Sequence, residues 1–296
     1  MPPEVVEFAR ECRKQLERWH PGLVEEIDGY GEGLCCSPDD LLWHFTLGVS
    51  PGATRHCSSV GFYTENGPAV GRNYDFFYFV NMRHLVTTRA DGALAHMGMW
   101  EGCAGGRMDG INADGLWVSV HFGGCRQPKC LKPGLGFHHV ARMLLEKCST
   151  VPEAVAVLAE VPHIAPYSYF LADPREMCVV EASPERQRVR RPKDGVLACT
   201  NHPVHPEMVD LESTDIRTNS CRRLARLHAG AKMALANEHP MEVLEDTMRD
   251  HMAPVCGHRD GLATLWSAIC VPGLRHIAYC FGAPCRNPYT PSPWPE

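Results

Sequence analysis

The spacing of apolar positions along the chain changes near residue 57. Between residues 3 and 19 apolar side chains recur every three or four positions, which predicts an amphipathic helix. A second helix is predicted to start at Ser37, because the Ser-Pro-Asp-Asp stretch supplies a cap, a first-turn proline and acidic side chains before LLWHF. From Cys57 onward the pattern becomes that of strands.

The predicted strands come as hairpins. SSVGFY and PAVGRN flank an Asn66-Gly67 pair that suits a tight turn, and residues 84–100 repeat this form around Asp91-Gly92. Residues 105–122 are expected to form a glycine-rich loop that leads into one strand. A meander is predicted over residues 168–202, and two last strands over 263–271 and 275–281.

Helical patterns separate these groups of strands. They begin near Phe137 and at residues 149–154, and they fit residues 216–234 and 240–252. Grouped strands and helices favour an α+β fold with antiparallel sheets covered by helices over a doubly wound parallel sheet. We find no internal repeat and no Gly- or Ser-rich linker, so we expect a single globular domain.

Composition narrows the classes of function. The chain has 296 residues, and its net charge of −6 comes without a basic stripe, which argues against nucleic acid as a partner. No apolar run is long enough to span a membrane, and the N-terminus lacks the apolar core of a secretory signal. The fifteen cysteines are scattered, many of them within apolar runs, so we expect reduced thiols in a cytoplasmic protein.

Cys57 differs from the other cysteines because polar and charged residues flank it. On composition alone a cysteine at a strand start is more often structural than catalytic. The returning strand of the same hairpin, however, carries Arg72 and Asp75, and Asn201 follows a later apolar strand. A thiol, two charged groups and an amide donor are the ingredients of nucleophilic acyl chemistry.

The order of motifs resembles a known family. The stretches are EEIDGYGEGLCCSPDDLL, CSSVGF, GRNYDF, GINADGLWVSV, LLEKCSTVPEAVAVL, YFLADPREMCVVEASP, CTNHP, NSCRRLARL and GAPCRNPY. They resemble the cysteine peptidases related to acyl-coenzyme A:6-aminopenicillanic acid acyltransferase, which are relatives of the choloylglycine hydrolases among the N-terminal-nucleophile (Ntn) hydrolases. The resemblance spans about residues 23–290 and implies a four-layer αββα sandwich of two antiparallel sheets.

The resemblance also implies a self-cleaving precursor. Cys57 matches the nucleophile, which becomes a new N-terminus when the bond between His56 and Cys57 is cut. Residues 1–56 would then be a helical pro-segment that stays associated, and residues 57–296 the catalytic domain. The free α-amine, whose pKa is ordinarily about 7.7 to 8.0, could take the thiol proton near neutral pH.

Further roles follow from the same resemblance. Arg72 and Asp75 match the pair that holds the nucleophile and its amine, and Asn201 matches an oxyanion donor. Arg223 matches a later arginine, with the adjacent Arg222 left as an alternative. His121 stands where relatives often have Asn, and either its backbone N–H serves the oxyanion or its side chain binds substrate. The chain departs from the family at His56, where a small residue is expected, and at Ser58, which replaces Thr.

We therefore expect an amidohydrolase or N-acyltransferase that works through a Cys57 thioester. Its substrate would be a small-molecule amide, acyl donor or acylated amino acid, no cofactor is expected, and a homo-oligomer is allowed. A non-catalytic binding or scaffold protein is the alternative. Cys256-Gly-His258 and His202-Pro-Val-His205 could each be half of a zinc site, but neither shows a second half at structural-zinc spacing, so no metal is expected.

Overall fold

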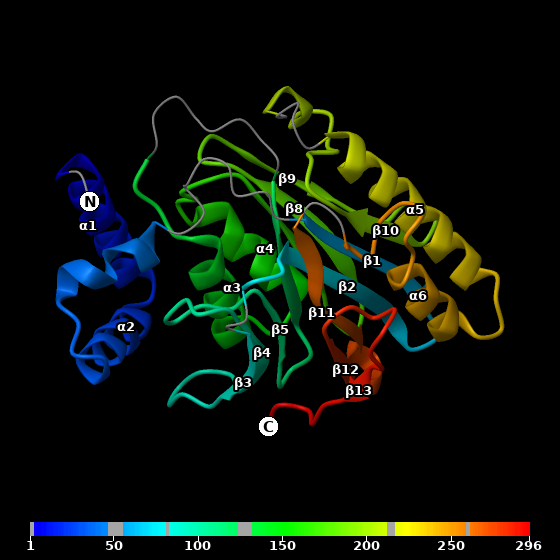
Figure 1. Ribbon diagram of the computed structural model, residues 1–296, viewed down its shortest axis with the longest axis horizontal. Coiled ribbons are helices and arrows are strands. Elements are labelled where there is room, and N and C mark those ends of the chain that lie inside the picture. The colour runs from blue at the N-terminus through cyan, green and yellow to red at the C-terminus, as the bar shows by residue number, and fades with distance from the viewer. Residues whose placement is uncertain (1–2, 47–55, 81–82, 124–131, 212–216, 259–260) are drawn as a thin grey trace.

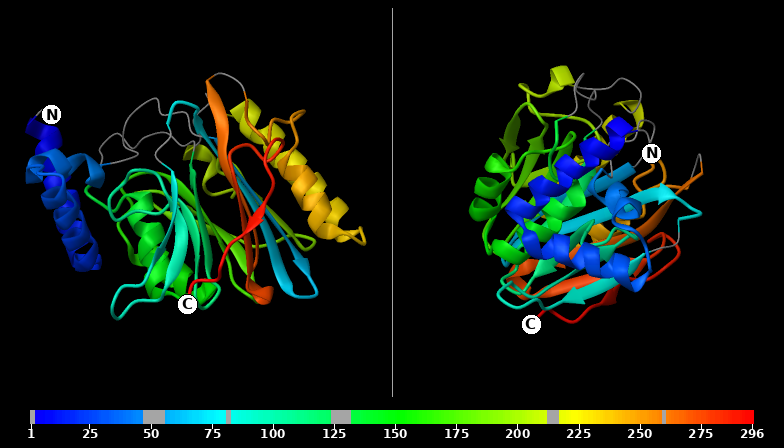
Figure 2. Two further views of the ribbon diagram at one scale, coloured as in Figure 1. Left: turned by 60° about the horizontal axis from the view of Figure 1, so that its bottom comes forward. Right: turned by 90° about the vertical axis from the view of Figure 1, so that its left-hand side faces the viewer.

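Two antiparallel sheets face each other at the centre of the molecule (Figures 1 and 2). The computed structural model describes residues 3–46, 56–80, 83–123, 132–211, 217–258 and 261–296. The six-stranded sheet has the order β10 (Val196–Cys199), β1 (His56–Thr64), β2 (Gly67–Phe77), β11 (Leu262–Val271), β12 (His276–Phe281) and β13 (Thr290–Pro291). The seven-stranded sheet runs in chain order through β3 (His84–Thr88), β4 (His96–Trp100), β5 (Asp109–Asn112), β6 (Trp117–Phe122), β7 (Tyr167–Ala172), β8 (Met177–Ala182) and β9 (Gln187–Arg190).

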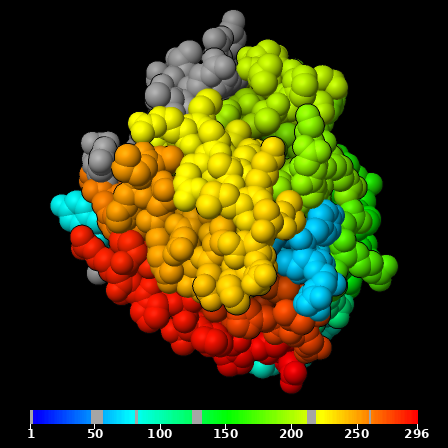
Figure 3. Space-filling model, turned by 90° about the vertical axis from the view of Figure 1, so that its right-hand side faces the viewer, coloured from blue at the N-terminus to red at the C-terminus, as the bar shows by residue number. Residues whose placement is uncertain are grey.

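Helices cover the outer face of each sheet. One pair, α5 (Arg217–Leu235) and α6 (Pro240–Met248), packs on β1, β2 and β10 of the six-stranded sheet and lies at the centre of the face seen in Figure 3. The other pair, α3 (Phe137–Lys147) and α4 (Val151–Glu160), packs on β5 to β8. Two 3₁₀ turns, η2 (Val209–Leu211) and η3 (Pro272–Leu274), lie in connections. The predicted four-layer αββα sandwich is confirmed.

Burial on both strand faces explains this layering. Every residue of β7 and of β8 is buried, so each of these strands needs a partner layer on both sides. One apolar core lies between the sheets and extends under α3 and α4. A smaller core lies between the six-stranded sheet and α5 and α6, and includes Val60, Phe62, Leu227, Leu244 and Ile269.

Helix α2 and strand β5 were not expected from the sequence, and glycines weaken the local pattern in both. Residues Pro21–Gly33 form helix α2, whose helical pattern is weakened by Gly22, Gly29 and Gly31. Leu41 packs so closely over Gly31 that a Cβ there would lie 2.4 Å from the leucine Cδ1. Strand β5 formed where a loop was expected, and a Cβ at its Gly110 would lie 2.4 Å from the carbonyl oxygen of Met97.

The N-terminal segment forms a separate layer outside α3 (Figure 2). It consists of α1 (Pro3–Trp19), α2 and the 3₁₀ helix η1 (Pro38–Phe45), which starts at the Ser37 cap as predicted. No helix in the described parts of the chain is long and apolar enough to cross a membrane.

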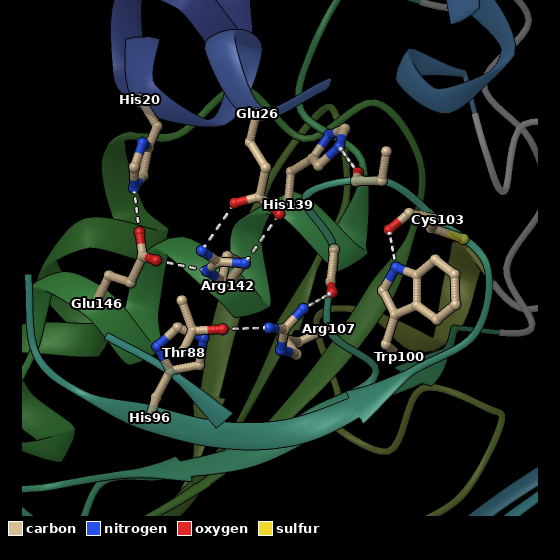
Figure 4. Close-up of polar contacts among 12 residues, drawn as sticks. His20, Glu26, Thr88, His96, Trp100, Cys103, Arg107, His139, Arg142 and Glu146 are labelled. Carbon is tan, nitrogen blue, oxygen red and sulfur yellow. Dashed lines mark hydrogen bonds and ion pairs between the residues drawn. The ribbon is translucent and has the colours of Figure 1, made fainter. Parts of the chain in front are cut away.

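Charged side chains join this segment to α3, and the two on α3 are buried (Figure 4). His20 Nε2 lies 2.5 Å from Glu146 Oε2, and Arg142 bridges Glu146 Oε1 at 2.5 Å and Glu26 Oε2 at 3.0 Å. Burial alone would raise the pKa of Glu146, but the His20 hydrogen bond and the Arg142 charge outweigh it and lower the pKa to about 2. These ion pairs are direct side-chain contacts between residues 3–46 and α3.

We predict that acid destabilises the protein steeply. Burial lowers the pKa of several histidines, to about 4 for His44, His56 and His163, to about 3 for His96 and His139, and well below the usual value for His121. Below pH 6.5 the unfolded state protonates these rings and the folded state does not, so the free energy of unfolding falls with pH. Each ring contributes a loss of about 1.4 kcal/mol per pH unit until its folded-state pKa is reached.

Urea unfolding at pH 7 and pH 5 measures this effect. His163→Gln is a suitable variant for this test. The ring Nε2 lies 3.1 Å from the carbonyl oxygen of Leu158, and the ring packs against Tyr169 of β7. The substitution should reduce the pH dependence of the free energy of unfolding by about one histidine's share. Burial raises the pKa of Asp75 to about 6 and also raises that of Asp109. These two carboxyl groups act in the opposite direction but are outnumbered by the histidines. Equal free energies of unfolding at the two pH values would contradict the prediction.

Candidate active site

The register of the β1–β2 hairpin sets the directions of the predicted site residues. His56 pairs with Asp75, Cys57 with Tyr74 and Ser59 with Arg72. Because side chains alternate along a strand, Cys57 and Arg72 share one face and Asp75 lies on the other. The first face points to the seven-stranded sheet, where Ser59 Oγ lies 3.3 Å from Ser119 Oγ of β6.

The backbone of Cys57 is held on both sides of the residue. Its N–H donates to Asn201 Oδ1 at 2.9 Å, and its carbonyl oxygen accepts from Arg223 Nη1 at 2.6 Å. The same arginine donates to Ser58 Oγ at 3.0 Å and to Asn201 Oδ1 at 2.8 Å. Three segments that are distant in sequence therefore converge on one cysteine, which is itself 2% exposed.

Arg223, not Arg222, lies at this site. Arg223 projects from α5 and is fully buried, and its Nε donates to Asn219 Oδ1 at 2.6 Å. Burial lowers the pKa of Arg223, while the charge of Asp75 opposes this shift. Arg222 is exposed and donates to the carbonyl oxygen of Met252 at 2.9 Å.

Asn201 follows β10, and its amide is fixed in one orientation. Its Oδ1 faces Cys57 and Arg223, and its Nδ2 donates to the carbonyl oxygen of Phe122 at 3.0 Å. Its backbone N–H donates to Ser220 Oγ at 2.8 Å. The acceptor end of the amide therefore lies against the peptide nitrogen of Cys57. The oxyanion role suggested by the family resemblance stays a prediction.

Arg72 and Asp75 do not pair with each other. Arg72 Nε lies 2.5 Å from Asp109 Oδ2, its Nη1 donates to the carbonyl oxygen of Val120 at 3.0 Å, and both charged side chains are fully buried. Arg72 thus ties β2 to the seven-stranded sheet on the Cys57 face.

Asp75 lies on the helix side of β2, near the point where the chain enters β1. Its Oδ1 accepts from Thr264 Oγ1 at 2.5 Å. Burial raises the pKa of Asp75 to about 6, although Thr264 and the charges of Arg223 and Arg72 act against this shift. Asp75 pairs with His56, the residue before Cys57, whose own pKa burial and Arg223 lower to about 4.

The His121 side chain also reaches the site. It contacts the backbone of Cys57, and its Nε2 lies 3.5 Å from Arg72 Nη1. Burial and the charges of Arg72 and Arg223 lower its pKa well below the usual value. His121 is therefore a neutral ring at neutral pH.

A small pocket opens beside the nucleophile candidate. Its cavity volume is about 10 Å³, roughly the room of one water molecule. Apart from Cys57, its lining is apolar or aromatic: Tyr74, Met108, Val120, Phe122, Phe137 and Tyr167. The pocket suits an uncharged group next to the sulfur.

Sequence reasoning missed two polar contributors to the site, Asp109 and Thr264. Asp109 accepts from Trp266 Nε1 at 2.8 Å and from Tyr279 Oη at 3.2 Å, besides pairing with Arg72. Both residues come from strands far from the hairpin in sequence, and no local motif marks them. Thr264 lies opposite Asp75 in the pairing of β11 with β2, whereas Asp109 reaches Arg72 from β5 of the other sheet.

Comparison with known families decides the assignment of this chain. A family model described as acyl-coenzyme A:6-aminopenicillanic acid acyl-transferase matches residues 62–286. The chain belongs to this family. The match covers most of the chain and includes the positions of Arg72, Asp75, His121, Asn201 and Arg223. No curated protein matches the chain by sequence.

Solved structures place this acyl-transferase family member among Ntn hydrolase folds. An N-acylethanolamine-hydrolyzing acid amidase ortholog from Caenorhabditis elegans is 16% identical with a TM-score of 0.55, covering 73% of this chain and 93% of its own. A conjugated bile acid hydrolase from Clostridium perfringens is 13% identical with a TM-score of 0.56, covering 80% and 97%. Penicillin V acylase from Agrobacterium tumefaciens is 17% identical with a TM-score of 0.51, covering 76% and 82%. At these identities the likeness establishes the fold.

Proposed function

We propose that this protein is a self-processing cysteine Ntn hydrolase or acyltransferase that cleaves or forms an amide bond of a small molecule through a Cys57 thioester. The observation that carries the proposal is the pair of side-chain hydrogen bonds to the Cys57 backbone. Its peptide N–H donates to Asn201 Oδ1, and its carbonyl oxygen accepts from Arg223. A structural cysteine inside a strand needs no such side-chain contacts, because the sheet ladder satisfies its backbone.

Processing would begin with Cys57 acting on its own peptide bond. The sulfur attacks the His56 carbonyl carbon, the C–N bond breaks, and the nitrogen takes a proton to become the free α-amine of Cys57. Water then hydrolyses the thioester and leaves a carboxylate on His56. Asn201 Oδ1 already accepts from this nitrogen at 2.9 Å, so the new amine would keep its partner, and Asp75 lies opposite His56 to offer a negative charge.

The excised pro-segment would stay bound after the cut. In the segment, His20 contacts Glu146 of α3 and Glu26 contacts Arg142 of α3. Lys147 Nζ, also on α3, donates to the carbonyl oxygen of Trp19 at 2.7 Å. Arg142 and Glu146 are 2% and 4% exposed with the segment in place. Losing the segment would expose an ion pair and an apolar surface together.

Turnover would use the same groups. The neutral α-amine of Cys57 takes the thiol proton, the thiolate attacks the acyl carbonyl, and the leaving amine takes the proton back as the thioester forms. Water resolves the thioester in hydrolysis, and a second amine resolves it in acyl transfer. Arg223 and Asn201 hold the nucleophile in position throughout, which favours a near-attack geometry.

We expect the acyl group to be small and apolar, because the pocket at Cys57 is narrow and lined by Phe122, Phe137 and Tyr167 among others. Steady-state kinetics on N-acyl amides, with and without added amines, tests this expectation. Short aliphatic acyl groups should have kcat/KM at least about tenfold above charged acyl groups of similar length, since a buried charge without a partner is costly. Preference for a charged acyl group would contradict the proposal about the pocket.

A further inference from the structure

Four possible metal ligands cluster outside the site described above. The side chains of His251, Cys256, His258 and Cys285 each offer one ligand atom, and these atoms all lie within 4.8 Å of one another. Three of the residues follow α6, and the fourth follows β12. The sequence suggested only the Cys256-Gly-His258 half of this group, because the second half comes from positions with no regular spacing to it.

The distances suit a single tetrahedral ion. His258 Nε2 lies 3.4 Å from Cys256 Sγ and 3.1 Å from Cys285 Sγ, and the His251 and His258 rings lie 5.1 Å apart at an interplanar angle of 82°. With zinc–sulfur bonds of about 2.3 Å and zinc–nitrogen bonds of about 2.0 to 2.1 Å, the ligand atoms of a tetrahedral site lie roughly 3.3 to 3.8 Å apart. The cluster is already close to that size.

The loop that carries these ligands is held in shape independently of any ion. Cys256 N–H donates to the carbonyl oxygen of Asp250 at 2.9 Å, and the Asp250 carboxylate accepts from Ala253 N–H at 2.8 Å and from Arg226 Nε at 2.9 Å. Cys256 is buried, while His251 and His258 are exposed. A fixed sulfur with accessible imidazoles allows an ion to enter from solvent and find a preorganised anchor.

We propose that His251, Cys256, His258 and Cys285 bind one zinc ion in a structural Cys₂His₂ site. Four protein ligands leave no open position for a reacting water, which is the arrangement of structural zinc sites. The mixed thiolate and imidazole set favours zinc over calcium or magnesium, which prefer oxygen ligands.

The zinc site lies next to a group that supports the active site. Thr264 Oγ1, which donates to Asp75 Oδ1, lies 3.8 Å from Cys256 Sγ and accepts from Gly257 N–H at 2.9 Å. A Cβ at Gly257 would lie 3.2 Å from Asp75 Cγ. Zinc would therefore fix the loop that packs against Asp75, and it acts on the active site only through that packing.

Metal analysis of the purified full-length protein tests the proposal. Protein prepared under reducing conditions without chelator should contain about one zinc per chain, and Co²⁺ added to the stripped protein should give the visible absorption of a tetrahedral thiolate site. Cys285→Ala and His258→Ala should each lower the zinc content at least tenfold. Thermal melts of both variants establish whether they remain folded.

Cys221→Ala is the matched control. Its sulfur also lies 3.5 Å from a histidine nitrogen, that of His202, and it is partly buried like Cys285, but it lies outside the cluster. This variant should keep its zinc. Failure of the stripped, folded, reduced protein to take up zinc or Co²⁺ would overturn the proposal, and so would a Cys256–Cys285 disulfide found in protein prepared with reductant.

Discussion

Replacing Cys57 with alanine is expected to abolish both self-cleavage and turnover. The variant keeps the contacts of the Cys57 backbone with Asn201 and Arg223, so it should fold, yet it lacks the sulfur that forms the thioester. Loss of a nucleophile costs about 10⁴-fold or more in rate. Intact mass should show one uncut chain, and kinetics with the best amide substrate should show no more than residual activity.

The matched control for this variant is Cys270→Ala. Cys270 is also fully buried in the six-stranded sheet, on β11, where it pairs with Ile277 and Val70 rather than with site residues. Its loss should reduce stability slightly and leave processing intact. A Cys57→Ala chain that still splits between residues 56 and 57 would remove Cys57 from the mechanism.

Arg223→Met should destabilise the fold and stop processing. The guanidinium makes hydrogen bonds to Cys57, Ser58, Asn201 and Asn219, and its charge opposes the rise in the pKa of Asp75. Removing one partner from a buried charge cluster typically costs about 3 to 5 kcal/mol. Urea unfolding should show a loss of this size, and the uncut fraction of the chain should rise.

Two further variants separate the effect of Arg223 on the stability of the fold from its effect on the position of Cys57. Arg222→Met alters the exposed neighbour and should change the free energy of unfolding by less than about 0.5 kcal/mol. Arg223→Lys keeps the charge but not the planar fork of donors, so it should recover stability more fully than processing. Equal stability and processing of Arg223→Met and Arg222→Met would contradict the assigned role.

The sequence predicts the layers of this fold better than it predicts the contacts within the site. Hairpin turns at Asn66-Gly67 and Asp91-Gly92 and the apolar helical faces are local signals, and each of the hairpins and most of the helices formed as expected. Helix α2 and strand β5 were missed because glycines that allow close packing also weaken the local pattern.

At the site, a sequence motif on a strand does not predict which partners its side chains contact. Arg72 and Asp75 share one short motif, but residues three apart on a strand point to opposite faces, so Arg72 pairs with Asp109 and Asp75 with Thr264. The choice between Arg222 and Arg223 depends on the rotation of α5 against β1, which sequence does not report. The sequence likewise does not show that His251 and Cys285 lie beside Cys256 and His258, because the fold brings these residues together from separate segments.

Mass spectrometry of the purified, unmodified protein tests the central claim most directly. Under denaturing conditions we predict two chains, residues 1–56 and 57–296, with Cys57 as the N-terminal residue of the larger one. Under native conditions the two should remain together. A single intact chain of 32.9 kDa whose Cys57 does not react with iodoacetamide would contradict the proposal and favour a non-catalytic binding or scaffold protein.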